Sequence, residues 1–292
     1  MEIKFTKMHG CGNDYVYIDN YVGNYDISDK SDLAKLISDR HFGVGSDGLI
    51  FINPSASADF EMEMYNADGS RAQMCGNGIR CVAKFVYDHG YASGDRFTIE
   101  SAGSIKTVSI SAHDGVAKDI TVDMGRPVFK AADIPVISDI DPVIAKDILI
   151  DEDIYKVTCV SMGNPHAVVF AGQEGSTTFD LSILNIANIG PLFENHSIFP
   201  ERVNTEFVCV TDKHHIKMRV WERGAGETLA CGTGCCACVA AGVLNGFTDN
   251  EVTVSVLGGD LNILWDRTSD HIFMTGPAET VFTGIYNYKE NN

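Results

Sequence analysis

The sequence predicts an α+β fold with two pseudo-symmetric domains, each a curved, mostly antiparallel sheet wrapped around a central helix. Three observations support this prediction: short strand-like segments outnumber helices, a tract of the first half recurs in the second, and one helix is apolar on nearly all sides. A helix without a polar face must be enclosed by other elements. Because its neighbours are mostly strands, a sheet curved around it is favoured over an open doubly wound sheet with alternating strands and helices.

The first half contains short strands and two helices. Runs of apolar and β-branched residues predict the strands, and residues 60–65 alternate between apolar and polar side chains. Ser31 predicts the N-cap of one helix, and apolar residues at helical spacing between Gly78 and Gly90 predict a second. A turn at residues 124–127 then precedes a new set of similar elements and marks a domain boundary. The predicted strands are residues 3–8, 15–19, 49–52, 60–65, 97–100, 105–111 and 120–123.

A weak internal repeat relates the two halves. A shift of 156 positions aligns residues 65–66 with 221–222 and residues 75–78 with 231–234. In both tracts an alternating strand is followed by a loop rich in small residues, a Cys-Gly-x-Gly turn and a helix. A shift of about 151 loosely aligns residues 8–13 with 160–164. Matches in the same order favour a duplicated domain, with one such turn from each half facing a shared cleft that would hold the active site.

The composition excludes several classes of protein. The chain of 292 residues has 22 basic and 40 acidic side chains, for a formal net charge of −18, and no basic run that would bind nucleic acid or a membrane surface. The N-terminal residues lack the apolar segment of a signal peptide, so we expect a cytoplasmic protein with reduced cysteines. The uncharged residues 228–248 have too short an apolar core to span a membrane and predict a loop before a buried helix.

The two Cys-Gly-x-Gly turns carry the clearest chemical signal. Each opens a predicted helix, where unpaired N–H groups and the helix dipole lower the pKa of a thiol and attract a carboxylate. If the turns face each other, one thiolate can remove the α-proton of an amino acid while the opposing thiol protonates the other face. Backbone N–H groups that follow the cysteines would stabilise the charge that develops. Neither pyridoxal phosphate nor a metal is required, and we expect no cofactor.

Six longer motifs include these turns. They are Phe5-Thr-Lys-Met-His-Gly-Cys-Gly-Asn-Asp14, Tyr65-Asn-Ala-Asp-Gly-Ser70, Met74-Cys-Gly-Asn-Gly-Ile-Arg-Cys81, Ser161-Met-Gly-Asn-Pro-His166, Pro200-Glu-Arg-Val-Asn204 and Trp221-Glu-Arg-Gly-Ala-Gly-Glu-Thr-Leu-Ala-Cys-Gly-Thr-Gly234. In type and order they resemble the motifs of the diaminopimelate epimerases, from about Ile3 to Tyr286. Six motifs of this length are far more specific than a single turn.

The resemblance implies conversion of LL-diaminopimelate to the meso isomer, in the synthesis of lysine and peptidoglycan precursors. It implies that Cys75 and Cys231 are the acid/base pair and that His166 and Glu222 tune the thiols. It also implies one domain of residues 1–124 with 277–292, a second of residues 125–276, and a homodimer. The substrate-binding positions that carry over are Asn13, Asn66, Gly76, Asn77, Asn164, Asn204, Glu222, Arg223, Gly232 and Thr233.

Two positions depart from the family pattern. Many members have a glutamine that touches substrate where this chain has Gly48, so that contact is absent or replaced. Position 11 is a cysteine instead of the more usual leucine, and it could be a bystander thiol near the site.

Other readings of the same residues remain open. Cysteine is often a buried packing residue, which is our expectation for Cys159, Cys209, Cys236 and Cys238. Cys231, Cys235 and Cys238 share one helical face, but structural zinc sites usually combine ligand pairs from separate turns. The glycine loop at residues 43–48 lacks the lysine of a phosphate-binding loop. The alternative functions are a proline or hydroxyproline racemase and a thiol-based metal-binding or redox-sensing protein.

Overall fold

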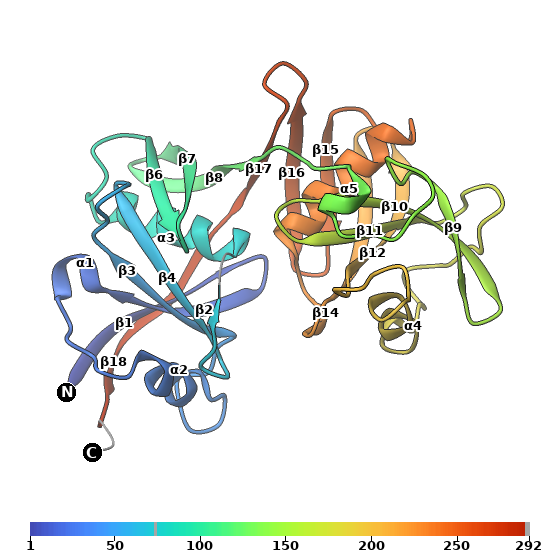
Figure 1. Ribbon diagram of the computed structural model, residues 1–292. Helices are drawn as coiled ribbons and strands as arrows, with labels where there is room; N and C mark the ends of the chain where they lie inside the picture. Colours follow the sequence, from blue (N-terminus) through green and yellow to red (C-terminus); the bar gives the residue numbers. More distant parts are fainter. Residues whose placement is uncertain (73–74, 290–292) are drawn as a thin grey trace. The chain divides into compact units, whose positions relative to one another are not determined.

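The computed structural model describes residues 1–72 and 75–289. Met74 of the third motif and residues 290–292 of the predicted first domain lie outside the described residues. The chain folds into two compact units, Met1–Val122 with Gly276–Asn292 and Asp123–Thr275 (Figure 1). None of the helices in the described part is long and apolar enough to cross a membrane.

The first unit is built mainly of strands. Its elements are β1 (Glu2–Gly10), β2 (Asn13–Asp19), α1 (Asn20–Gly23), α2 (Lys30–Ser38), β3 (Gly48–Asn53), β4 (Phe60–Asn66), β5 (Arg71–Ala72), α3 (Gly76–Asp88), β6 (Arg96–Ser101), β7 (Ser104–His113), most of β8 (Val116–Gly125) and β18 (Glu279–Asn287). All seven strands predicted in this half are present, most of them a few residues longer than expected.

The second unit is also built mainly of strands. Its elements are a 3-10 turn (Ala131–Asp133), β9 (Lys146–Ile150), β10 (Asp153–Ser161), β11 (Pro165–Phe170), α4 (Ile186–Glu194), β12 (Asn204–Asp212), β13 (His215–Glu222), β14 (Gly226–Thr228), α5 (Gly232–Leu244), β15 (Glu251–Val256), β16 (Gly259–Asp266) and most of β17 (His271–Pro277).

The order of strand pairing is the same in both units. In the first, β1 pairs with β2 antiparallel, β2 with β3 parallel, β3 with β4 antiparallel, β4 with β6 parallel and β6 with β7 antiparallel. In the second, β10, β11, β12, β13, β15 and β16 follow the same alternation. The predicted α+β fold with two pseudo-symmetric domains is therefore confirmed, with two parallel pairs at matching places among the mostly antiparallel strands of each unit.

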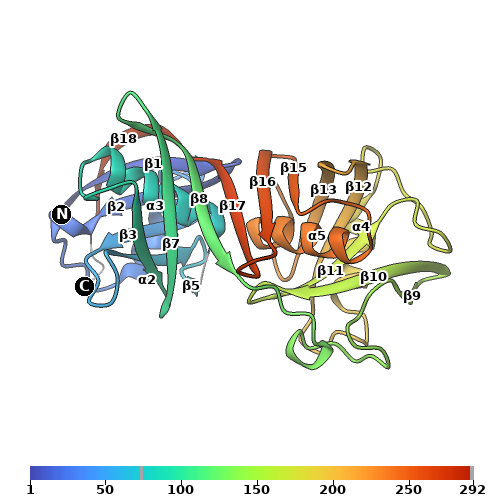
Figure 2. The same ribbon diagram turned by 90° about the horizontal axis from the view of Figure 1, so that it is seen from above.

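One long helix lies at the centre of each unit. Every residue of α3 from Gly76 to Val86 is buried, and α3 packs on β1, β2 and β7. Nearly all of α5 is buried from Gly232 to Gly242, against β10, β11, β12 and β16 (Figure 2). Each large apolar side chain buried in this way contributes roughly 1.5–3 kcal/mol. The N-terminal ends of both helices carry the Cys-Gly-x-Gly turns.

The N-cap predicted for the helix near residue 31 is wrong. Helix α2 begins at Lys30, and its N-cap is Asp29, whose carboxylate accepts a hydrogen bond from the N–H of Asp32 at 2.8 Å. The Ser31 hydroxyl instead donates to the carbonyl of Gly69 at 2.8 Å. Both residue types are good N-caps, and a partner distant in the sequence decides between them.

Candidate functional site

Cys75 is the N-cap of α3. Its backbone is extended, with φ −132° and ψ 115°, and its Sγ accepts a hydrogen bond from the N–H of Gly78 at 3.3 Å. The thiol donates to Oδ1 of Asn13, 3.2 Å away. Nδ2 of Asn77 reaches the same oxygen at 3.5 Å. Three of the predicted site residues of the first unit therefore meet at the positive end of the α3 dipole.

A buried arginine supports this turn. Arg80 is 0% exposed, and its guanidinium donates to the carbonyl of Gly76 at 3.1 Å and to Oδ1 of Asn77 at 2.9 Å. Its Nε donates to the carbonyl of Pro277 at 3.2 Å. Its Nη2 also contacts Sγ of Cys11 at 3.7 Å, and Cys11 is only 3% exposed. Cys11 is thus a buried group beside the supporting arginine.

A chain of charged residues fixes the side chain of Asn13. Its Nδ2 donates to Asp47 at 2.8 Å, and Arg40 bridges Asp47 and Asp14 with contacts of 2.8 Å to each. Lys7 forms a further ion pair with Asp14. Although burial would raise the pKa of Asp14, hydrogen bonds from Arg40 and Lys7 hold that pKa below its usual range. The Oδ1 of Asn13 is thereby left directed at Cys75.

The structure explains why position 48 has no side chain. A Cβ on Gly48 would lie 2.2 Å from the carbonyl oxygen of Tyr65 and 2.8 Å from Cε1 of Tyr15. Tyr15 pairs with Gly48 in the parallel β2–β3 register, and its hydroxyl interacts with Cys75 and Asn13. Burial, with the neighbouring Cys75, raises the pKa of Tyr15, so the phenol stays protonated. Tyr15 was not predicted from the sequence as a site residue, because its only signal is its position opposite Gly48.

Cys231 is the N-cap of α5 and lies in a different electrostatic environment. It is 6% exposed, and its Sγ lies 3.4 Å from Oγ1 of Thr233. Burial, followed by the negative charges of Glu222 and Glu206, raises the pKa of Cys231 well above its ordinary value. The N–H of Gly234 in the first turn of α5 does lower the pKa of this thiol, as expected for a helix N-terminus, but desolvation and the two carboxylates outweigh this effect.

Glu222 and Arg223 do not form an ion pair with each other. The Glu222 carboxylate accepts a hydrogen bond from the Thr228 hydroxyl, and burial raises its pKa. The Arg223 guanidinium donates to the carbonyl of Glu201 at 2.9 Å, while its backbone N–H donates to Oδ1 of Asn204 at 2.8 Å. The side chains of Glu222 and Arg223 are thus held apart, because each forms hydrogen bonds with a different partner.

His166 lies in a buried polar cluster of the second unit. Its Nε2 is 3.0 Å from Oδ1 of Asn164, and its Nδ1 is 2.6 Å from Oε1 of Glu206. Both His166 and Glu206 are completely buried. Glu206 was not predicted from the sequence, although a lone acidic residue before the apolar residues 207–208 was a signal that could have identified it.

Among the remaining predicted positions, Asn66 ends β4 and donates to the Ser70 hydroxyl at 2.9 Å. Gly76 and Gly232 begin α3 and α5, so their N–H groups belong to the first turns. In the first unit the structure brings Asn13 and Asn77 to the turn of Cys75, and in the second it brings Glu222 and Thr233 to Cys231. Asn164 and Asn204 contact His166 and the Arg223 backbone, and Asn66 and the Arg223 side chain contact other partners.

The other cysteines are packing residues of the cores. Cys159, Cys235, Cys236 and Cys238 are buried, and Cys209 is half-buried. Burial raises the pKa of Cys159 to about 12. In residues 1–72 and 75–289, no group of three or more His, Cys, Asp or Glu side chains is arranged to hold a metal ion.

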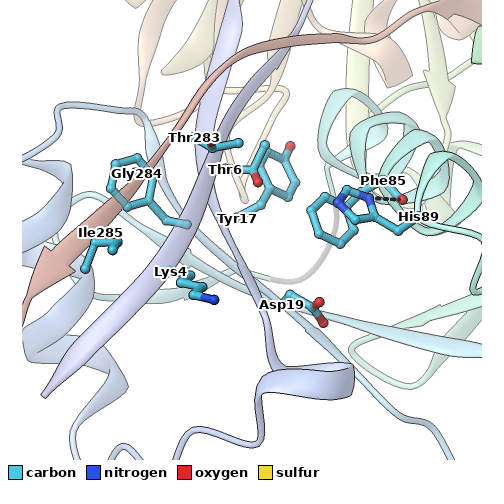
Figure 3. Close-up of a pocket in the computed structure, with 10 residues that line it drawn as sticks. Lys4, Thr6, Tyr17, Asp19, Phe85, His89, Thr283, Gly284 and Ile285 are labelled. Atoms are coloured by element: carbon cyan, nitrogen blue, oxygen red, sulfur yellow. Dashed lines mark hydrogen bonds between the residues drawn. The ribbon is translucent and has the colours of Figure 1, made fainter.

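Two cavities lie at the opposite ends of the central helices from the thiols. In the first unit, a cavity of about 350 Å³ is bounded by Phe85 and His89 near the C-terminal end of α3 and by strands β1, β2 and β18 (Figure 3). In the second, a cavity of about 600 Å³ includes Gly246 and Phe247, just after α5. Neither contains a predicted site residue.

Comparison with known proteins agrees with the motifs. The family model of the diaminopimelate epimerases matches residues 5–130 and 158–281. The chain belongs to the diaminopimelate epimerase family. It is 52% identical to the diaminopimelate epimerase of Methanococcus maripaludis over 97% of this chain and 99% of that one. It is 49% identical to that of Acetivibrio thermocellus over 99% and 100% of the two chains.

Solved structures extend the similarity at the level of the fold. A phenazine biosynthesis protein of Bacillus anthracis superposes with a TM-score of 0.68 at 17% identity, covering 99% of this chain and 100% of that one. A probable proline racemase of Agrobacterium radiobacter gives a TM-score of 0.68 at 15% identity, over 99% and 93%. Membership of the diaminopimelate epimerase family makes the chain an isomerase, whereas these distant structures show its fold alone.

Proposed function

We propose that the protein epimerises LL-diaminopimelate to meso-diaminopimelate with Cys75 and Cys231 as the two acid/base groups and without a cofactor. The observation that carries the proposal is that each of two similar units places one thiol at the N-cap of its buried central helix. The relatives about 50% identical over nearly the full chain are named for this reaction.

The reaction requires both thiols to reach one α-carbon from opposite faces. One sulfur takes the α-proton as a thiolate, and the electron pair left on the carbon delocalises into the carboxylate. N–H groups of the first helical turns, at Gly76, Asn77, Gly232 and Thr233, would stabilise that charge. The other thiol then gives its proton to the opposite face. The enzyme ends with its two sulfurs in exchanged protonation states, and both must be reduced, as in a cytoplasmic location.

The second amino-acid end of the substrate provides specificity. It carries an ammonium and a carboxylate of its own, so a site for it needs groups of both signs. Glu222 and Arg223 supply one charge of each sign and are held apart by their partners. Asn13, Asn66, Asn164 and Asn204 can both donate and accept.

A substrate panel in deuterated water tests the proposal. We expect LL-diaminopimelate to convert to the meso isomer with deuterium at the inverted carbon only. Chiral chromatography identifies the isomer, and mass spectrometry measures the deuterium. Activity should survive treatment with a chelator. Turnover of proline or hydroxyproline in place of diaminopimelate would contradict the proposal and favour a racemase of the same fold. Stoichiometric metal, or a reversible disulfide without turnover, would favour a metal-binding or redox-sensing protein.

We further propose that the enzyme is a homodimer that uses β18. This strand exposes Phe282 (46%) on one face and Ile285 (56%) on the other, with Val281 (54%) at the irregularity beside Phe282, and a partner copy lying along the strand would cover these apolar side chains. Phe282→Lys is expected to weaken dimerisation about 30-fold or more, as for an aromatic interface residue whose loss costs at least about 2 kcal/mol. Sedimentation velocity across a dilution series measures this. Val116→Lys, at an apolar residue 41% exposed on β8, is the control that should not change association.

A further inference from the structure

The two halves differ in the residue that packs against the last glycine of each Cys-Gly-x-Gly turn. A Cβ on Gly78 would lie 2.9 Å from Cδ1 of Ile50, and a Cβ on Gly234 would lie 2.7 Å from Oε1 of Glu206. Ile50 and Glu206 are 156 positions apart, the same shift that relates the two cysteines. An apolar side chain beside the first thiol turn therefore corresponds to a carboxylate beside the second.

Burying the carboxylate of Glu206 costs free energy in this environment. Its side chain is 0% exposed; Oε1 contacts Nδ1 of His166 at 2.6 Å, while Oε2 has no hydrogen-bond partner among the described residues. The effective penalty of burying one ion is several kcal/mol, which the imidazole and the N-terminus of α5 offset in part. Since Ile50 fills the matching place in the other unit, packing alone does not account for an acidic residue here.

Several charged and polar groups face Cys231 from the surrounding elements. Glu222 comes from β13, Glu206 from β12 and the Thr233 hydroxyl from α5, and the N–H of Gly234 also interacts with the sulfur. His166 on β11 interacts with both carboxylates. The two negative charges disfavour a thiolate at this position, whereas Ile50 brings no charge to the turn of Cys75.

We propose that Glu206 is a positioning residue that makes the two thiols unequal: its buried carboxylate holds Cys231 in the thiol form in the resting enzyme and fixes the His166 ring through Nδ1. This inference rests on the proposed two-thiol reaction and adds a division of roles to it. For the isomer whose α-proton Cys75 removes, the unit with the buried carboxylate therefore supplies the proton donor of the first turnover. Glu206 acts through Cys231 and His166 and does not itself touch the substrate.

Glu206→Gln tests the inference without substrate, because it removes the charge and keeps the shape. We expect the pH profile of Cys231 alkylation, read peptide by peptide in a mass spectrometer, to shift to lower pH by about one unit. At a fixed pH below the midpoint of the profile, a shift of this size makes alkylation of Cys231 about tenfold faster. The profile of Cys75 should not move. Glu206→Met, also neutral and of similar length, should give the same shift, whereas Glu206→Asp should keep the original profile.

Glu194→Gln is the matched control for loss of a buried carboxylate. Glu194 is 6% exposed in the same unit and binds Arg202 and the Trp221 indole, so its replacement should not shift the Cys231 profile. In turnover, the limb of the kcat/KM profile that belongs to Cys231 should move to lower pH in Glu206→Gln in both reaction directions. A purely structural role would lower kcat/KM and leave that limb in place.

The outcomes separate the two proposals. An unchanged Cys231 alkylation profile in both neutral variants would overturn the role of Glu206, whatever the activity of the enzyme. A shifted profile in a protein that does not epimerise diaminopimelate would support the charge effect and contradict the proposed function.

Discussion

Replacing Cys75 or Cys231 by alanine is expected to reduce epimerisation of LL-diaminopimelate by about a thousandfold or more. In the proposed mechanism each thiol supplies one of two proton transfers, and one positioned acid or base contributes about 10²–10⁴-fold. Chiral chromatography of the product measures the loss. Cys81→Ala and Cys236→Ala, at buried cysteines of the same two helices, are the controls and should retain most activity.

Deuterium exchange in these variants distinguishes two bases from one. The remaining thiol can still remove and return the α-proton of the isomer that presents this proton to it. We therefore expect Cys75→Ala and Cys231→Ala each to exchange the α-hydrogen of one isomer only, and each a different one, without inversion. A variant that still interconverts the isomers at a substantial rate would rule out its thiol as an obligatory acid or base.

Arg80→Met is expected to lower the free energy of unfolding of the first unit by about 3 kcal/mol and to raise KM. Three hydrogen bonds from a charged donor are lost, each contributing about 1.5–3 kcal/mol, while the methionine stem recovers part of the packing. The carbonyl of Gly76 and the amide of Asn77 are then no longer fixed beside the thiol. Urea denaturation monitored for each unit, together with steady-state kinetics, measures both effects.

Arg71→Met provides the control for Arg80. The Arg71 side chain is 61% exposed and lies 3.9 Å from Glu63, so its loss should change stability by less than about 1 kcal/mol. Arg80→Lys keeps the charge but not the planar donor set and should be intermediate. Wild-type stability and KM in Arg80→Met would show that the turn does not depend on this guanidinium.

The sequence was sufficient for the architecture and for the two thiol turns. An apolar α5 requires enclosure, and a repeat at a constant shift of 156 requires two similar units; both depend on patterns that persist over many residues. The N-cap positions of Cys75 and Cys231 also follow, because a glycine turn before a helical pattern has one simple local solution.

Features that depend on distant partners could not be predicted in this way. The pKa of Cys231 is raised by burial, by Glu222 and by Glu206, which is 25 positions away, and together these outweigh the lowering effect of the helix N-terminus. The carbonyl of Tyr65 and the ring of Tyr15 occupy the place where a side chain on Gly48 would lie, a relation visible only in the strand registers. Each of these contacts exists only after the sheets have formed.

The correspondence of Ile50 with Glu206 has a consequence for how such a fold can catalyse an asymmetric exchange of protons. If the same site were built from two separate copies of one half-length chain, every substitution beside one thiol would appear beside the other. Covalent linkage of the two halves removes that restriction. The two halves can then evolve thiols of unequal acidity, while the shared strand order keeps both thiols on equivalent scaffolds.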